Sequence, residues 1–159
     1  MAYKNLQWLF PIAVTLHNGE EAIWMPGWVS RNATQLPVRA PEAAEIRFAL
    51  IALTLAAFVV TCLSARKGPQ SVWAYLVFGS VIAMLGNVFV PHVPATVMFH
   101  SYTPGVVTAV LINLPVMSLL AMQAVQDRWV VGWKAAAFGI GVPLFLGGAI
   151  LSVLSARAH

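Results

Sequence analysis

The sequence predicts an all-α protein, a polytopic transmembrane bundle of about five helices, and three observations support this fold class. Hydrophobic residues make up 60% of the chain and charged residues only 9%, with a mean hydropathy of +0.80, whereas soluble domains carry about 25% charged residues. Several apolar runs reach the ~20 residues that a helix needs to cross about 30 Å of hydrocarbon. Tryptophans lie near the ends of these runs, as in an interfacial belt.

The expected helices occupy residues 6–25, 46–65, 71–91, 103–123 and 131–154, within a single domain spanning residues 1–159. A polar loop rich in Pro and Arg follows the first run, and RKGPQ ends the second. The third run closes at PHVP, and the fourth opens at YTPG and ends before QDRW. The first run contains a pair of glutamates, unlike the apolar core of a signal peptide, so we expect it to be retained as a helix.

The positive charges lie singly at the ends of the apolar runs, where membrane proteins place them. The net charge of +4 therefore does not indicate a nucleic-acid partner. The short RKGPQ loop has the densest positive charge, which favours a cytoplasmic N-terminus. The single cysteine, Cys62, excludes a disulfide framework and a thiolate metal cage, and we expect it to be a packed, inert thiol.

The pentad HNGEE is the most unusual feature of the first apolar run. In a helix, His17, Glu20 and Glu21 stand at i, i+3 and i+4 and share one face. Helical rise puts His17 about 17 Å past Leu6, just beyond the bilayer midplane. One glutamate at this depth could snorkel to the surface. Three polar groups on one stripe indicate mutual pairing or a bound cation, because each charge near a helix centre costs about 2.5–3.5 kcal/mol.

Asn87, His92 and His100 are expected to meet this pentad in one half of the membrane. The first and third helices run in the same direction, and Asn87 lies about 21 Å past Trp73. His92 lies between two prolines, and irregular backbone at such depth is tolerated only where protein or a cavity surrounds it. His100 precedes the fourth helix on the same side. Each residue also has a structural alternative, as a hydrogen-bonding residue between helices or as an interfacial residue.

Imidazole and carboxylate ligands together suit a divalent transition metal, with zinc favoured and iron second. The candidate metal ligands are His17, Glu20, Glu21, His92 and His100. Two histidines and one glutamate form a set that catalytic zinc uses, and the second glutamate would act as general base. The candidate catalytic residues are therefore Glu20, Glu21 and Asn87, the last to orient a ligand or a substrate oxygen. Which glutamate takes which role stays open at this point.

The chain resembles the HXXEE-domain family of small bacterial membrane proteins. The resemblance rests on LFPIAVTLHNGEEAIWMPGW, on GNVFVPH and on the YTPGVVTAVLINLP stretch, and so covers most of the chain. It implies an active site at His17, Glu20 and Glu21, with Asn87 and His92 as the family's further Asn and His. It also implies a location in the bacterial inner (plasma) membrane. The family is defined by its motif and not by a reaction.

The expected function is an intramembrane metal-dependent enzyme acting on a lipid or another apolar small molecule, most simply by metal-assisted hydrolysis. One alternative is an iron-dependent oxidoreductase or isomerase at the same site. Another is a metal or proton carrier, although the opposite half of the membrane lacks the polar residues of a through path. A structural subunit with a polar cluster as internal glue is a further alternative, and the sequence leaves homo-oligomerisation open.

Overall fold

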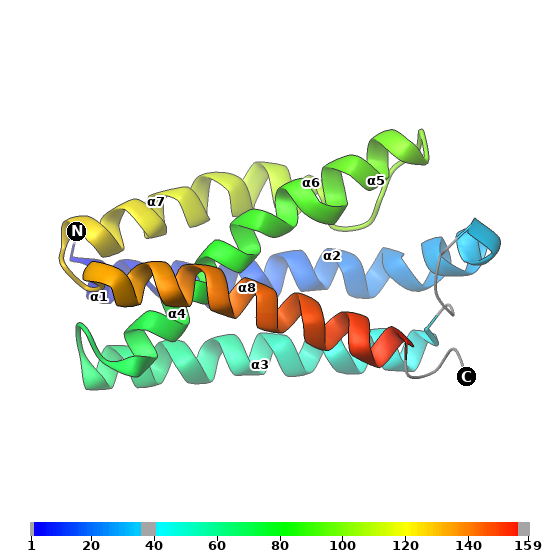
Figure 1. Cartoon of the computed structure of the whole chain (residues 1–159). Helices are drawn as coiled ribbons and strands as arrows, with labels where there is room; N and C mark the ends of the chain where they lie inside the picture. The colour runs from blue at the N-terminus through cyan, green and yellow to red at the C-terminus, as the bar shows by residue number, and fades with distance from the viewer. Residues whose placement is uncertain (1, 36–40, 156–159) are drawn as a thin grey trace.

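The computed structural model describes residues 2–35 and 41–155, and helices are the regular elements in these ranges. The elements are α1 (Tyr3–Leu6), α2 (Leu9–Asn32), the 3₁₀ turn η1 (Ala33–Gln35), α3 (Ala43–Lys67), α4 (Val72–Asn87), the π-helical turn η2 (Val88–His92), α5 (Val93–Met98), α6 (Val106–Thr108), the π-helical turn η3 (Ala109–Asn113), α7 (Leu114–Gln126) and α8 (Gly132–Ser155). The segments α2, α3, α4–α5, α6–α7 and α8 run alternately in opposite directions along the bundle (Figure 1). The predicted all-α bundle of about five long helices is confirmed.

Three of the helical segments are long and apolar enough to cross a membrane. They are Ala43–Lys67, Val72–Met98 and Val106–Gln126, and they are the segments that meet both conditions within the described residues. The segment α2 is not among them, because His17, Asn18, Glu20 and Glu21 interrupt its apolar sequence. In Figure 1, α2 nevertheless lies alongside the candidate spans, and His17 and Asn18 are buried in the bundle.

Local sequence signals set both ends of α3 and the start of α4. A capping box begins α3, in which the side chains of Glu42 and Glu45 each accept a hydrogen bond from the other's backbone N–H. The helix ends at Gly68, whose φ of 82° is open to glycine without a steric penalty. The Ser71 side chain then accepts a hydrogen bond from Ala74 N at 3.2 Å and caps α4. The two helices therefore reverse direction over a short, well-defined turn.

The helix α2 is longer than the expected residues 6–25, because it continues through Pro26 to Asn32. Proline lacks an N–H and normally leaves the carbonyl four residues earlier without its helical partner. Here that carbonyl belongs to Ala22, and Arg47 Nε of α3 donates a hydrogen bond to it at 3.4 Å. Trp28 is buried beyond the proline. A contact from a distant helix and the burial of Trp28 thus offset the local helix-breaking signal.

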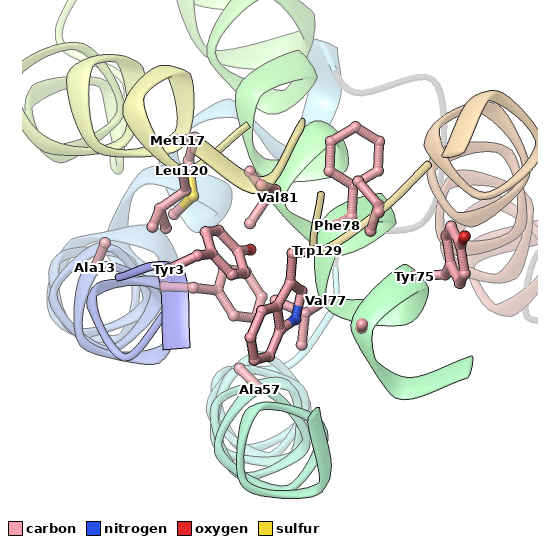
Figure 2. Close-up of a cluster of buried hydrophobic side chains, with 14 of the residues drawn as sticks. Tyr3, Ala13, Ala57, Tyr75, Val77, Phe78, Val81, Met117, Leu120 and Trp129 are labelled. Carbon is pink, nitrogen blue, oxygen red and sulfur yellow. The ribbon is translucent and has the colours of Figure 1, made fainter. Parts of the chain in front are cut away.

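The apolar core lies around the N-terminal end of α2, where α1, α4 and α7 pack together with the turn after α7 (Figure 2). Tyr3 and Trp129 pack with ring centroids 5.4 Å apart. Buried hydrogen bonds tie this end together, since Trp129 Nε1 donates to Ser64 Oγ at 3.2 Å and Ser64 Oγ donates to Gln7 Oε1 at 2.8 Å. This packed end fixes the positions of α2, α4 and α7. The polar residues of α2 come later along the helix, toward the opposite end of the bundle.

Asp127 anchors the first turn of the chain and makes stability dependent on pH. Its carboxylate accepts hydrogen bonds from Tyr3 N at 2.8 Å and Gln123 Nε2 at 2.7 Å. The Tyr3 bond first, and then the Gln123 bond, hold the pKa of Asp127 below its ordinary value. The stabilisation is therefore present above the ordinary pKa and is lost as the pH falls through the lowered one.

We expect the thermal unfolding midpoint of the wild type in detergent to decrease as the pH is lowered from about 5 to about 3. Asp127→Asn should show a smaller fall over this range, because it removes the titrating group. Scanning calorimetry of both proteins at each pH measures the difference. Parallel pH profiles for the two proteins would show that this carboxylate does not contribute.

Candidate metal centre

His17, Glu21 and His92 form one compact group that could hold a metal ion. Each offers one ligand atom, and these atoms all lie within 4.8 Å of one another. His17 and Glu21 are one turn apart on α2, whereas His92 comes from the break between α4 and α5. The side chains of His17 and His92 are only 1% and 2% exposed, and that of Glu21 is 12% exposed. The group is thus enclosed by protein.

The distances within this group are close to those of a metal site. Glu21 Oε1 lies 3.5 Å from His92 Nε2 and 3.8 Å from His17 Nε2. Ligand atoms at 2.0–2.1 Å from a tetrahedral zinc ion are about 3.4 Å apart. The two imidazole rings meet edge to face, with centroids 4.9 Å apart. Small side-chain movements would therefore bring all three atoms to coordination distance.

An interruption of the span Val72–Met98 brings His92 into the group. The backbone of Val90 is extended, with φ −148° and ψ 112°, and the helix resumes beyond it. Asn87, at the end of α4, spans the break and donates from Nδ2 to His92 Nε2 at 3.0 Å and to His17 Nε2 at 3.3 Å. Both Nε2 atoms therefore accept from the same amide nitrogen, and a metal bound by them would take the place of these two hydrogen bonds. Asn87 lies at the group, where it was predicted to orient a ligand or substrate.

Thr108 fixes the orientation of the His17 ring. Its Oγ1 lies 2.9 Å from His17 Nδ1 and donates its hydrogen to the carbonyl of Gly105 at 3.2 Å. Because His17 Nε2 accepts from Asn87 Nδ2, the neutral ring carries its proton on Nδ1 and donates it to Thr108. The other ring nitrogen, Nε2, is then left unprotonated and faces Glu21. Histidine ligands of metals commonly have an outer partner of this kind.

Gly105 lies directly against the group. Its φ is +88°, a left-handed conformation that side chains rarely adopt. A Cβ at this position would lie 2.6 Å from His92 Cε1, 2.9 Å from His17 Cε1 and 3.0 Å from Glu21 Oε1. The turn before α6 therefore covers the group, and only glycine fits there. The YTPG stretch stands out in the sequence, but no role was predicted for Gly105 or Thr108, because neither residue type indicates a metal site.

Glu20 points to this turn instead of joining the group. Its Oε2 accepts a hydrogen bond from Thr108 N at 2.8 Å, and its Oε1 accepts one from Gly105 N at 3.0 Å. The Tyr102 hydroxyl also donates to Oε1. Burial and the Glu20 carboxylate raise the pKa of Tyr102, so its hydroxyl stays protonated and remains a donor. The structure thus separates the adjacent glutamates, with Glu21 beside the histidines and Glu20 holding the turn that covers them.

His100 is not brought to the group either. It follows the end of α5, is exposed and has a positive φ of 45°. It was predicted to lie near the group, just before the fourth helix. However, the turn between α5 and α6 brings the backbone of Gly105 to the group and leaves the imidazole of His100 outside it.

The fold and the site together define a helical membrane protein with a buried His–His–Glu group between its helices. The chain belongs to the family described as "Protein of unknown function with HXXEE motif", whose model matches residues 8–120. His17, Glu20 and Glu21 are the motif residues, and the resemblance noted in the sequence is confirmed. A relative from Bacillus subtilis (strain 168), "Uncharacterized protein YrkK", is 35% identical over 126 residues, which cover 79% of this chain and 77% of the relative. No solved structure matches the chain.

Proposed function

We propose that the protein is an intramembrane metal-dependent hydrolase that acts on a lipid or another apolar small molecule, with zinc as the favoured metal. The observation that carries the proposal is the convergence of the ligand atoms of His17, Glu21 and His92 within 4.8 Å. Two histidines and one glutamate are a ligand set of catalytic zinc sites, which keep one position for water or substrate. In the same proposal, the protein resides in the bacterial inner membrane with its N-terminus in the cytoplasm.

Each polar residue near the group has a role in this proposal. His17, His92 and Glu21 would hold the metal. A zinc ion bound there would supply Lewis acidity and an activated water nucleophile at neutral pH. Asn87 orients the ligand or substrate oxygen through its amide. Glu20 is excluded as the free base, because its oxygens already accept three hydrogen bonds from the turn before α6.

The metal content of the purified protein tests the proposal. We expect about one zinc per chain in the wild type and less than about a tenth of that in His17→Ala and His92→Ala, because each variant removes one of three ligands. Elemental analysis of detergent-purified protein measures the content. The matched control is His100→Ala, which removes an exposed histidine outside the group and should keep the metal. Equally negligible metal in all four proteins would overturn the proposal.

The same donor set favours a second candidate function. Two histidines and one carboxylate with open positions also bind iron(II) in non-haem oxygenases. If the purified protein held about one redox-active iron per chain in place of zinc, an iron-dependent oxidation or isomerisation would be favoured over hydrolysis. The elemental analysis described above separates the two candidates without knowledge of the substrate.

A further inference from the structure

A cavity of about 380 Å³ adjoins the metal group. One part of its lining consists of Glu21, Asn87 and His92. Two of these residues are candidate ligands, and the third hydrogen-bonds both histidines. A molecule in this cavity would therefore have one end at the group.

The remaining lining is mostly apolar and includes Met25, Trp28, Pro91, Ala95 and Phe99. The rings of Trp28 and Phe99 meet edge to face, with centroids 5.0 Å apart. At about 30 Å³ for each water-sized atom, the cavity has room for about a dozen non-hydrogen atoms. It can hold one short apolar chain, and a complete two-chain lipid would not fit inside it.

Two hydrogen-bonding groups at the cavity have no partner within the protein. They are Trp28 Nε1 and Thr103 Oγ1, and both residues line the cavity. The residues are only 8% and 4% exposed. Nearly all buried polar groups in proteins are hydrogen-bonded, but these two atoms are themselves enclosed by protein, so they do not face the open cavity and do not identify its occupant.

Apolar walls alone would not select a ligand inside a membrane, because lipid chains are as apolar as the walls. The free energy of binding must come from polar contacts, and the walls then limit size and shape. Resting on the metal centre proposed above, we infer that the cavity binds the acyl part of a carbonyl compound with a single apolar chain of about a dozen non-hydrogen atoms. The carbonyl end lies at the group formed by His17, Glu21 and His92.

Binding of decanoyl hydroxamate to the zinc-loaded protein tests this inference, because the probe joins a metal-binding carbonyl group to a chain of the required size. The deciding variant is Ala95→Phe, which fills part of the cavity from a residue that is not a member of the metal group. We expect it to weaken binding of decanoyl hydroxamate at least about tenfold, and to leave binding of butanoyl hydroxamate unchanged. The matched control is Val97→Phe on the same helix, at a residue 66% exposed, which should bind both probes as the wild type does.

Two competitors test the carbonyl requirement at equal concentrations in the detergent phase. Decanamide should displace decanoyl hydroxamate, and undecane should not. Displacement by undecane as effective as by decanamide would overturn the inference, as would unchanged binding of decanoyl hydroxamate by Ala95→Phe. The zinc content measured on the same preparations keeps the two proposals apart. Protein that holds zinc but shows no such selectivity overturns the inference and leaves the metal centre standing.

Discussion

Gly105→Ala is expected to weaken metal binding by the His17, Glu21 and His92 group strongly, although residue 105 is not a ligand. A Cβ would lie within 3.0 Å of an atom of each of these three side chains. The left-handed backbone adds about 1–2 kcal/mol of strain for any residue with a side chain, and overpacking adds about 1–3 kcal/mol. Together these terms amount to about 2–5 kcal/mol. The metal-free protein relieves them by moving the turn away from the group, which the metal-bound group does not allow, so the metal affinity should fall about 30-fold or more. Titration of the metal-free protein with zinc measures the affinity.

Gly19→Ala is the matched control for this substitution. Gly19 lies within the same motif, between His17 and Glu20, but a Cβ there meets nothing within 4 Å. In a helix, alanine is favoured over glycine by about 1 kcal/mol, so this variant should keep the zinc affinity and gain stability. If both variants bound zinc as the wild type does, the close packing of Gly105 against the group would have no functional consequence.

The fold class could be predicted from the sequence because it depends on the average hydropathy of long segments, which a few polar or misassigned residues do not change. Apolar runs of spanning length force helices, since lipid offers no other partner for backbone groups. Helix bounds depend on single contacts and were less predictable. Pro26 signals a helix end, but Arg47, a distant residue on α3, hydrogen-bonds the carbonyl of Ala22 that this proline leaves without a helical partner. No local pattern encodes such a contact.

The candidate site was predictable where residue type and helix direction were sufficient. His17 and Glu21 share a helix face, and the depth of Asn87 and His92 along a helix running the same way brings them to that face. The division between the adjacent glutamates could not be predicted, because it depends on where the turn before α6 lies. The exposed position of His100 follows from the same turn.

The second large effect is that substitutions of the two adjacent glutamates should change different properties. Glu20 should affect mainly the stability of the protein, and Glu21 mainly its metal binding. Glu20→Gln removes the charge and puts an amide N–H₂ opposite donors that already point at the carboxylate, so we expect a loss of about 2–4 kcal/mol of stability. For a chain of this length, this corresponds to a fall of about 5–15 °C in the unfolding midpoint. Glu21→Gln removes a candidate ligand and should lose zinc, with little change in the midpoint of the metal-free protein.

Both midpoints must be compared in the metal-free state, because a bound metal would itself raise the midpoint of any protein that keeps it. Chelator-treated wild type, Glu20→Gln and Glu21→Gln are therefore unfolded under the same conditions, and zinc affinity is measured separately on each. Glu20 contacts the backbone of the turn and the Tyr102 hydroxyl, whereas Glu21 faces two imidazole nitrogens. A structural cluster without metal would make both substitutions destabilising and leave no zinc to lose. If Glu20 holds the turn that covers a metal centre, Glu20→Gln should lose mainly stability and Glu21→Gln should lose mainly the metal.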